Sequence, residues 1–178
     1  GGNAVNTSVG GAPYGSATSP TALGSGGGTF ASPGGLGGGA LKLGVTGTLT
    51  VAGTLGANGT NGQSSSGGGS GGSLWVSAGT LTGSGTLAAN GGASPSGGGG
   101  GSGGRINLEG VTTYSFTGQV QALGGTGSSR SLTGSVVFNC ACSVAASGSG
   151  PAKTSCCCAQ ARYLRTVFRL PCRSRALR

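Results

Sequence analysis

The chain has 178 residues, a formal net charge of +9 and 45 glycines, while 34% of its residues are apolar and 4% are aromatic. It contains no His, no Asp and no Met, and Glu109 is its single carboxylate side chain. Paired-carboxylate hydrolysis, Ser-His-Asp catalysis and His-based metal catalysis therefore lack their residues, so we expect no enzyme and no cofactor. The low apolar content also argues against a globule with one central core.

The positive charge lies almost entirely in the C-terminal part of the chain. Residues 1–128 carry Lys42, Arg105 and Glu109, a net charge of +1, and the other eight basic residues follow. A cationic tail without a folded framework is a nonspecific signal, so we expect no specific nucleic-acid partner. No apolar run approaches the length that spans a bilayer, and we expect no membrane span.

Residues 1–40 form a Gly-rich N-terminal segment with glycine runs at 24–28 and 34–39. We expect this segment to form a first coil or a cap, because the end of a stack of coils exposes apolar side chains and open strand edges. The chain begins at Gly1 rather than Met, which suggests a processed product or a fragment. Asn6 begins an Asn-Thr-Ser sequence that matches the N-glycosylation pattern.

Residues 41–138 contain a repeat of about 32 residues, which predicts an all-β parallel β-solenoid of about three to four coils. Apolar residues alternate with polar ones at the start of each unit, as expected for strands with one buried face. Like residues recur at spacings of 33, 32 and 30 residues. They form two predicted columns: Leu41, Leu74, Ile106, Val136 and Leu43, Val76, Leu108, Phe138.

A second pair of columns follows later in each unit, namely Leu55, Leu87, Val120 and Ala57, Ala89, Ala122. Asn58-Gly59 and Asn90-Gly91 come next, and this dipeptide predicts a tight turn with positive φ. The Ser- and Gly-rich segments 63–72 and 93–104 are predicted to be excursions, flexible or collapsed against the coils. A polyglycine-type helical bundle is the competing ordered structure, but glycine follows no strict three-residue period.

Two stretches, residues 67–92 (GGGSGGSLWVSAGTLTGSGTLAANGG) and 97–106 (GGGGGSGGRI), resemble a glycine-rich module of large secreted or cell-surface proteins. The segment from Tyr14 to Gly28 looks like a neighbouring part of the same module, and the resemblance covers about residues 14–138. It implies a right-handed parallel β-helix in an extracellular, adhesin-like or coat protein. It brings no defined activity and no catalytic residues to carry over.

Trp75 is a candidate ligand-stacking residue. It shares a predicted column with Lys42 and Asn107, and this column points outward from the aliphatic ladder. An exposed indole can stack on a sugar ring or on a partner, whereas the structural alternative is a ring that lies over the adjacent Gly-rich segment.

Threonines in outward columns form a candidate hydroxyl array that could order water, as ice-binding solenoids do. Threonine is also an ordinary strand residue, and the predicted array covers two coils before Gln119 interrupts it. Its members are Thr48, Thr50, Thr54, Thr80, Thr82 and Thr86.

Further candidate sites are for modification or cross-linking. Asn58 begins a second N-glycosylation pattern, Asn-Gly-Thr. The cysteines could form up to three disulfides or bind a soft metal, although their spacing matches neither a zinc ribbon nor a zinc finger. They are Cys140, Cys142, Cys156, Cys157, Cys158 and Cys172.

Residues 139–178 form a Cys- and Arg-rich tail that we expect to be irregular, and whose abrupt change in usage resembles translation out of frame. For the whole chain, we expect an extracellular or cell-surface structural or adhesive protein that self-associates end to end or laterally. The alternative is a carbohydrate- or ice-binding module. A polysaccharide lyase on the same fold is a third hypothesis, which would have to depend on Glu109.

Overall fold

The computed structural model describes residues 1–5, 10–128, 132–139, 143–144 and 154–155, and within these ranges the protein is all-β. The strands vary in length from two to eleven residues. They are β1 (Ala40–Thr50), β2 (Thr54–Gly56), β3 (Ser73–Gly83), β4 (Thr86–Ala88), β5 (Arg105–Glu109), β6 (Thr113–Phe116), β7 (Gln119–Gln121), β8 (Ser135–Asn139), β9 (Ser143–Val144) and β10 (Thr154–Ser155).

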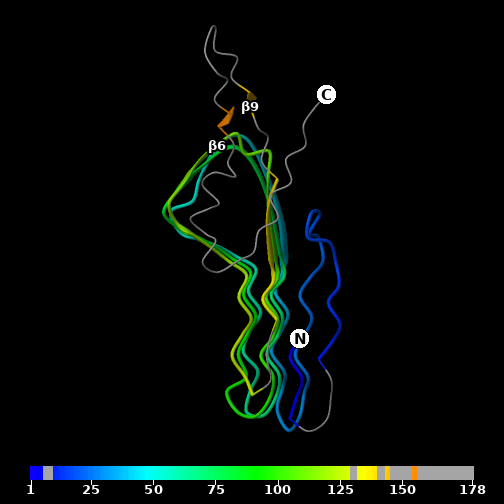
Figure 1. The fold of residues 1–178 in the computed structure, drawn as a ribbon. Helices are drawn as coiled ribbons and strands as arrows, with labels where there is room; N and C mark the ends of the chain where they lie inside the picture. Colours follow the sequence, from blue (N-terminus) through cyan, green and yellow to red (C-terminus); the bar gives the residue numbers. More distant parts are fainter. Residues whose placement is uncertain (6–9, 129–131, 140–142, 145–153, 156–178) are drawn as a thin grey trace.

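The strands stack as a parallel β-solenoid of about three turns. One sheet has the order β1-β3-β5-β8, with β6 also paired to β3, and a second sheet has the order β2-β4-β7. All of these pairs are parallel, whereas β9 and β10 form a separate antiparallel pair. Figure 1 shows the coils wound one behind another in the upper part of the molecule.

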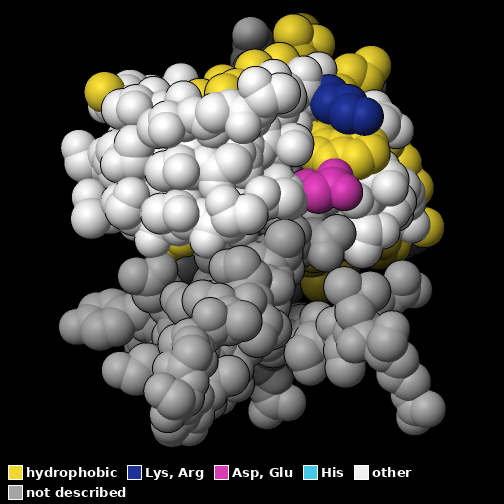
Figure 2. Space-filling model, turned by 90° about the horizontal axis from the view of Figure 1, so that it is seen from above, with side chains coloured by type: hydrophobic (Ala, Val, Ile, Leu, Met, Phe, Trp, Pro, Cys, Tyr) yellow, Lys and Arg dark blue, Asp and Glu magenta, His cyan; other side chains and the backbone are white. Residues whose placement is uncertain are grey.

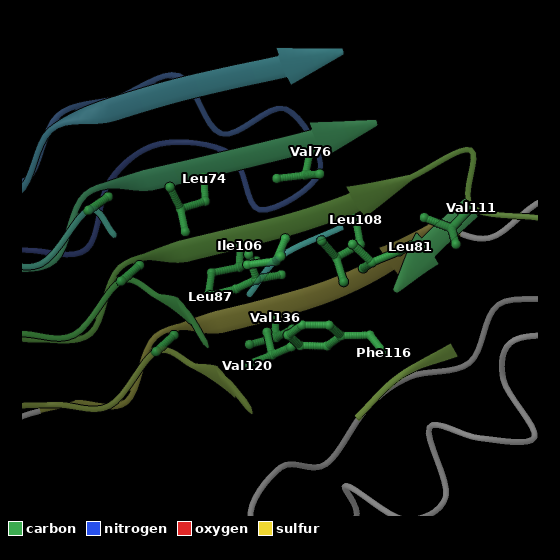
Figure 3. Packing of buried hydrophobic residues seen from close by; sticks show 14 residues of the cluster. Leu74, Val76, Leu81, Leu87, Ile106, Leu108, Val111, Phe116, Val120 and Val136 are labelled. Carbon is green, nitrogen blue, oxygen red and sulfur yellow. The ribbon is translucent and has the colours of Figure 1, made fainter. Parts of the chain in front are cut away.

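The strand register confirms the predicted aliphatic columns. Leu41 pairs with Leu74, Leu74 with Ile106 and Ile106 with Val136. The column that begins at Leu43 and the column that begins at Leu55 are confirmed in the same way. Apolar side chains from both sheets meet between them, as Figure 3 shows, and they include Leu74, Val76, Leu81, Leu87, Ile106 and Leu108, all fully buried.

Below the coils, the Gly-rich segments are also ordered, although their residues belong to no strand. In Figure 1 they run side by side as extended, undulating segments in the lower part of the molecule. Backbone hydrogen bonds join them into one bundle, which we call the glycine lattice. Its segments are residues 1–3, 24–28, 34–39, 57–63, 66–72, 89–94, 98–104, 122–128 and 132–134.

Hydrogen bonding in the glycine lattice has a period of three residues. Gly67, Gly68 and Gly69 donate to three different segments, at Gly28, Gly99 and Thr60. The next three residues then donate to the same three segments in the same order, at Ser25, Ser102 and Ala57. Extended helices with three residues per turn and no internal hydrogen bonds have this arrangement.

The centre of the lattice is saturated with backbone hydrogen bonds. The carbonyls of Gly67, Gly68 and Gly69 accept from Gly35, Gly2 and Gly92, in three segments other than those that receive their N–H groups. Six segments therefore surround residues 67–69. Neighbouring backbones approach so closely that a Cβ on Gly69 would lie 1.9 Å from the Leu36 carbonyl oxygen.

Segments 63–72 and 93–104 were expected to be flexible or collapsed, and the flexible form is wrong, because most of their residues pack in the lattice against neighbouring segments. The tight turns predicted at Asn58-Gly59 and Asn90-Gly91 are also wrong: the chain runs on through them, and positive φ occurs later, at Ser64 (43°) and Gly97 (75°). The three-residue period describes which neighbouring segment each N–H group points to. It does not fix the residue type at each position, so the amino-acid sequence shows no strict period.

The N-terminal residues contribute to both parts of the molecule. Residues 34–39 come directly before β1, and residues 66–72 come directly before β3. The two segments run in parallel, because the Gly35 N–H donates to the Gly67 carbonyl and the Gly38 N–H donates to the Ser70 carbonyl. The carbonyl of Thr18 accepts a hydrogen bond from the Asn107 carboxamide at 2.8 Å, so this part of the segment lies over the outer side of β5.

Candidate functional site

A regular set of hydroxyl groups lies on the outer side of three adjacent strands, β1, β3 and β6. Thr48 pairs with Thr80 and Thr80 with Thr113, while Thr50 pairs with Thr82 and Thr82 with Ser115. The residues between them, Leu49, Leu81 and Tyr114, belong to the core or pack against it. Because side chains alternate across a strand, the six hydroxyl residues share the opposite face. We call them the hydroxyl face.

The hydroxyl face is not engaged by side-chain hydrogen bonds within the described part of the chain. None of its six side-chain hydroxyls makes a hydrogen bond within the described residues. Its members are exposed on β1 and β6 and half-buried on β3, the middle strand. Parallel strands lie about 4.8 Å apart and alternate residues on a strand about 6.6 Å apart, so the paired hydroxyl residues form a regular array.

This array differs from the predicted one at its third coil. Gln119 replaces threonine only in the column of Thr54 and Thr86. The other two columns continue to Thr113 and Ser115, which sequence reasoning missed. The signal was the hydroxyl-apolar-hydroxyl triplet Thr113-Tyr114-Ser115, which repeats Thr80-Leu81-Thr82.

Trp75 lies in the predicted outward column, beside Lys42 on β1 and Asn107 on β5. The Lys42 Nζ is 3.8 Å from the indole centroid, and the indole Nε1 donates to Glu109 Oε2 at 2.6 Å. Figure 2 shows the basic, apolar and acidic side chains in a row on this face. Trp75 is half-buried, and the Lys42 ammonium covers one face of its ring, so a stacking ligand would have to displace that ammonium or use the other face.

Asparagine side chains connect successive turns of the glycine lattice. The Asn58 Oδ1 accepts from the Asn90 N–H at 2.7 Å, and the Asn90 Oδ1 accepts from the Leu123 N–H at 2.9 Å. Asn61 makes the same contact with Ala93 at 2.8 Å. Asn58, the candidate glycosylation residue, is exposed but uses its carboxamide oxygen in this series.

A groove of about 690 Å³ opens beside the lattice, between residues 1–3 and the segments that lead into β5 and β8. Glycines make up much of its lining, together with Ser102, Thr133 and Arg105. The Arg105 guanidinium carbon lies 5.2 Å from the centroid of the Tyr14 ring. Burial lowers the pKa of the Gly1 amine at the groove from its usual value.

Several predicted sites lie outside the described residues. Asn6 and the six candidate disulfide cysteines are among them, as is most of the Arg-rich tail. In the described ranges, no group of three or more His, Cys, Asp or Glu residues could hold a metal ion. The described part of the chain also has no helix that is long and apolar enough to cross a membrane.

Comparison with known proteins adds no assignment to this geometry. The chain matches no protein-family model, no curated protein and no solved structure.

Proposed function

We propose that the protein is a non-enzymatic structural or adhesive component of an extracellular or cell-surface assembly, and that copies associate through the end of the solenoid. One observation carries the proposal: among the described residues, the stack of coils ends at β1, and the far edge of this strand has no partner strand. β1 is eleven residues long and pairs with β3 on one side, where it is the terminal strand of its sheet. Such edges are templates for pairing with another chain.

The exposure of side chains at this end supports the same conclusion. Leu41 is 38% exposed, whereas Leu74, its partner in the next coil, is fully buried. Leu41 thus has the environment of a core residue that lacks one neighbouring coil. A further coil from a second copy would cover it, and burying such a side chain contributes about 1.5 to 3 kcal/mol.

The test is the concentration dependence of the molecular mass, followed by analytical ultracentrifugation of the full chain. We expect oligomers that weaken in the variant Leu41→Lys, because a charge would face the incoming coil. Leu123→Lys is the matched control, since Leu123 is also 38% exposed but lies in the glycine lattice. A chain that stays monomeric at every concentration, or equal effects of the two variants, would contradict self-association through β1.

A second candidate function is the binding of ice or of a carbohydrate, and the hydroxyl face favours it. The six hydroxyls have no partner in the described chain and repeat over three coils. The double variant Thr80→Val, Thr82→Val keeps the shape and strand preference of the face but removes its central hydroxyls. Thermal hysteresis and glycan pull-down would then decrease, while Thr29→Val, outside the face, leaves both unchanged. No activity in either assay for the unmodified protein excludes this function.

A further inference from the structure

The Asn58 side chain uses its oxygen inside the glycine lattice and leaves its nitrogen free. The Asn58 Oδ1 accepts from the Asn90 N–H at 2.7 Å, whereas the Asn58 Nδ2 makes no hydrogen bond within the described part of the chain. The residue is exposed. In the next coil Asn90 is half-buried, and its Nδ2 donates to Gln121 Oε1 at 3.2 Å. Asn58 therefore presents a free carboxamide nitrogen at the surface while its oxygen stays fixed.

The residue two places after Asn58 is Thr60, and the lattice has room for its side chain. The equivalent residues in the next two coils are glycines, Gly92 and Gly125. A Cβ on Gly92 would lie 1.9 Å from the Thr60 carbonyl oxygen, and a Cβ on Gly125 would lie 2.0 Å from the Gly92 carbonyl oxygen. A threonine in either place would collide with backbone. Of these equivalent positions, the lattice therefore tolerates the N-glycosylation pattern Asn-X-Thr only at Asn58.

We propose that Asn58 is the attachment site of an N-linked glycan, transferred from a lipid-diphosphate-linked oligosaccharide. The Asn58 Nδ2 forms a bond to C1 of the first sugar, the bond from C1 to the diphosphate oxygen breaks, and the proton lost by Nδ2 passes to a base of the transferase. Oδ1 takes no part in the new bond and still accepts from the Asn90 N–H. The site rests on the proposed extracellular location, because this transfer takes place in the secretory pathway.

The contacts of Thr60 determine when the glycan is added. The Thr60 N–H donates to the Leu36 carbonyl at 2.9 Å, and the Thr60 carbonyl accepts from the Gly69 N–H at 3.0 Å. The Thr60 Oγ1 accepts from the Leu36 N–H at 2.7 Å, so the hydroxyl that the pattern requires is held by the lattice. The glycan is therefore added before residues 57–63 enter the lattice, and the folded protein then carries it on its surface.

The test uses the full chain, expressed behind a cleavable secretion signal in a eukaryotic host that glycosylates proteins. After denaturation, trypsin cuts after Lys42 and Arg105, so Asn58 and the pattern at Asn6 lie on different peptides. Release of the glycan by a peptide N-glycosidase in ¹⁸O-water labels the asparagine that carried it. We expect the label at Asn58. Absence of the label there, both in the cells and in the medium, overturns the proposal.

Asn61 is the internal control for this measurement. Its Oδ1 accepts from the Ala93 N–H at 2.8 Å, its Nδ2 has no hydrogen bond within the described chain, and it is exposed, as Asn58 is. Both asparagines precede a glycine, but Asn61 is followed by Gly-Gln and lacks the pattern. We expect no label at Asn61. Equal labelling of Asn58 and Asn61 would show spontaneous deamidation and would also overturn the proposal.

Two variants of Thr60 test the pattern itself. Thr60→Ala should abolish the label at Asn58, and Thr60→Ser should keep it. Because the glycan is added before folding, a loss of stability in Thr60→Ala cannot account for a missing glycan. Undiminished labelling of Asn58 in Thr60→Ala contradicts the site.

Two further measurements test the part of the proposal that depends on the lattice. With purified transferase and its lipid-linked donor, the folded, unmodified protein should react at least about tenfold more slowly than a peptide of residues 55–63, because reaction requires local opening. In the glycosylated protein, the Asn90 amide should exchange as slowly as in the unmodified protein. Equal reaction rates, or an unprotected Asn90 amide, contradict the proposal. None of these measurements depends on self-association through β1, so the two proposals can fail separately.

Discussion

Glycine has two different roles in this chain, and the structure separates them residue by residue. At most glycines inside the glycine lattice a Cβ would collide with backbone, as at Gly69, where it would lie 1.9 Å from the Leu36 oxygen. At Gly39, the last residue of its lattice segment and the one immediately before β1, a Cβ would meet nothing within 4 Å. The first kind of glycine is required by packing, whereas the second is replaceable.

This contrast predicts the effect of two matched alanine variants. Gly69→Ala should lower the free energy of unfolding by at least about 2 kcal/mol, because neither the Cβ nor the opposing backbone can move without breaking lattice hydrogen bonds. Gly39→Ala should change it by less than about 0.5 kcal/mol. Urea unfolding of both variants measures the difference. Equal stabilities would show that the lattice is not closely packed in solution.

At the scale of single elements, the strands are the part of the fold that the sequence predicted well. Leu74, Ile106 and Val136 recur at nearly constant spacing, and stacked coils place like residues above like, so the register could be read directly. The hydroxyl face was predicted in part. Its third coil has Tyr114 where the other coils have leucine, and the spacing between the second and third coils is one residue longer here than at the start of the strand. Sequence reasoning therefore missed Thr113 and Ser115.

The same column predicts how burial controls stability. Leu74→Ala should destabilise the protein by about 2 to 5 kcal/mol, because it leaves a cavity between two coils. Leu41→Ala removes the same atoms from the same column but at its open end, so it should cost less than about 1.5 kcal/mol. Thermal unfolding of dilute protein, below the concentration at which copies associate, compares the two. A Leu41 variant as unstable as the Leu74 variant would contradict the open end.

At the scale of the whole molecule, each coil joins two kinds of stacking. The strands bury aliphatic side chains between two sheets, and the Gly-rich segments of the same coils bury backbone against backbone. The spacing of apolar residues in the sequence predicted the first kind of stacking but not the second. What defines a residue of the glycine lattice is the segment that accepts its N–H hydrogen bond, not its residue type. Ser70, Ala57 and Thr60 occupy lattice positions beside glycines, so the sequence shows no strict glycine period.

The groove was equally inaccessible to sequence reasoning. It depends on how the segments pack against one another, and Ser102, which lines it, resembles every other serine in its neighbourhood of the sequence. The aromatic and charged residues that sequence reasoning did single out, such as Trp75 and Glu109, contact each other instead.

Amide hydrogen exchange tests most directly whether the Gly-rich segments form an ordered lattice. The N–H groups of residues 67–72 all donate to neighbouring segments, whereas the Ser102 N–H in the adjoining segment has no partner in the described chain. We predict that residues 67–72 exchange as slowly as the amides of β3 and that Ser102 exchanges much faster. Exchange of residues 67–72 at the rate of an unfolded peptide, with β3 still protected, would contradict the lattice.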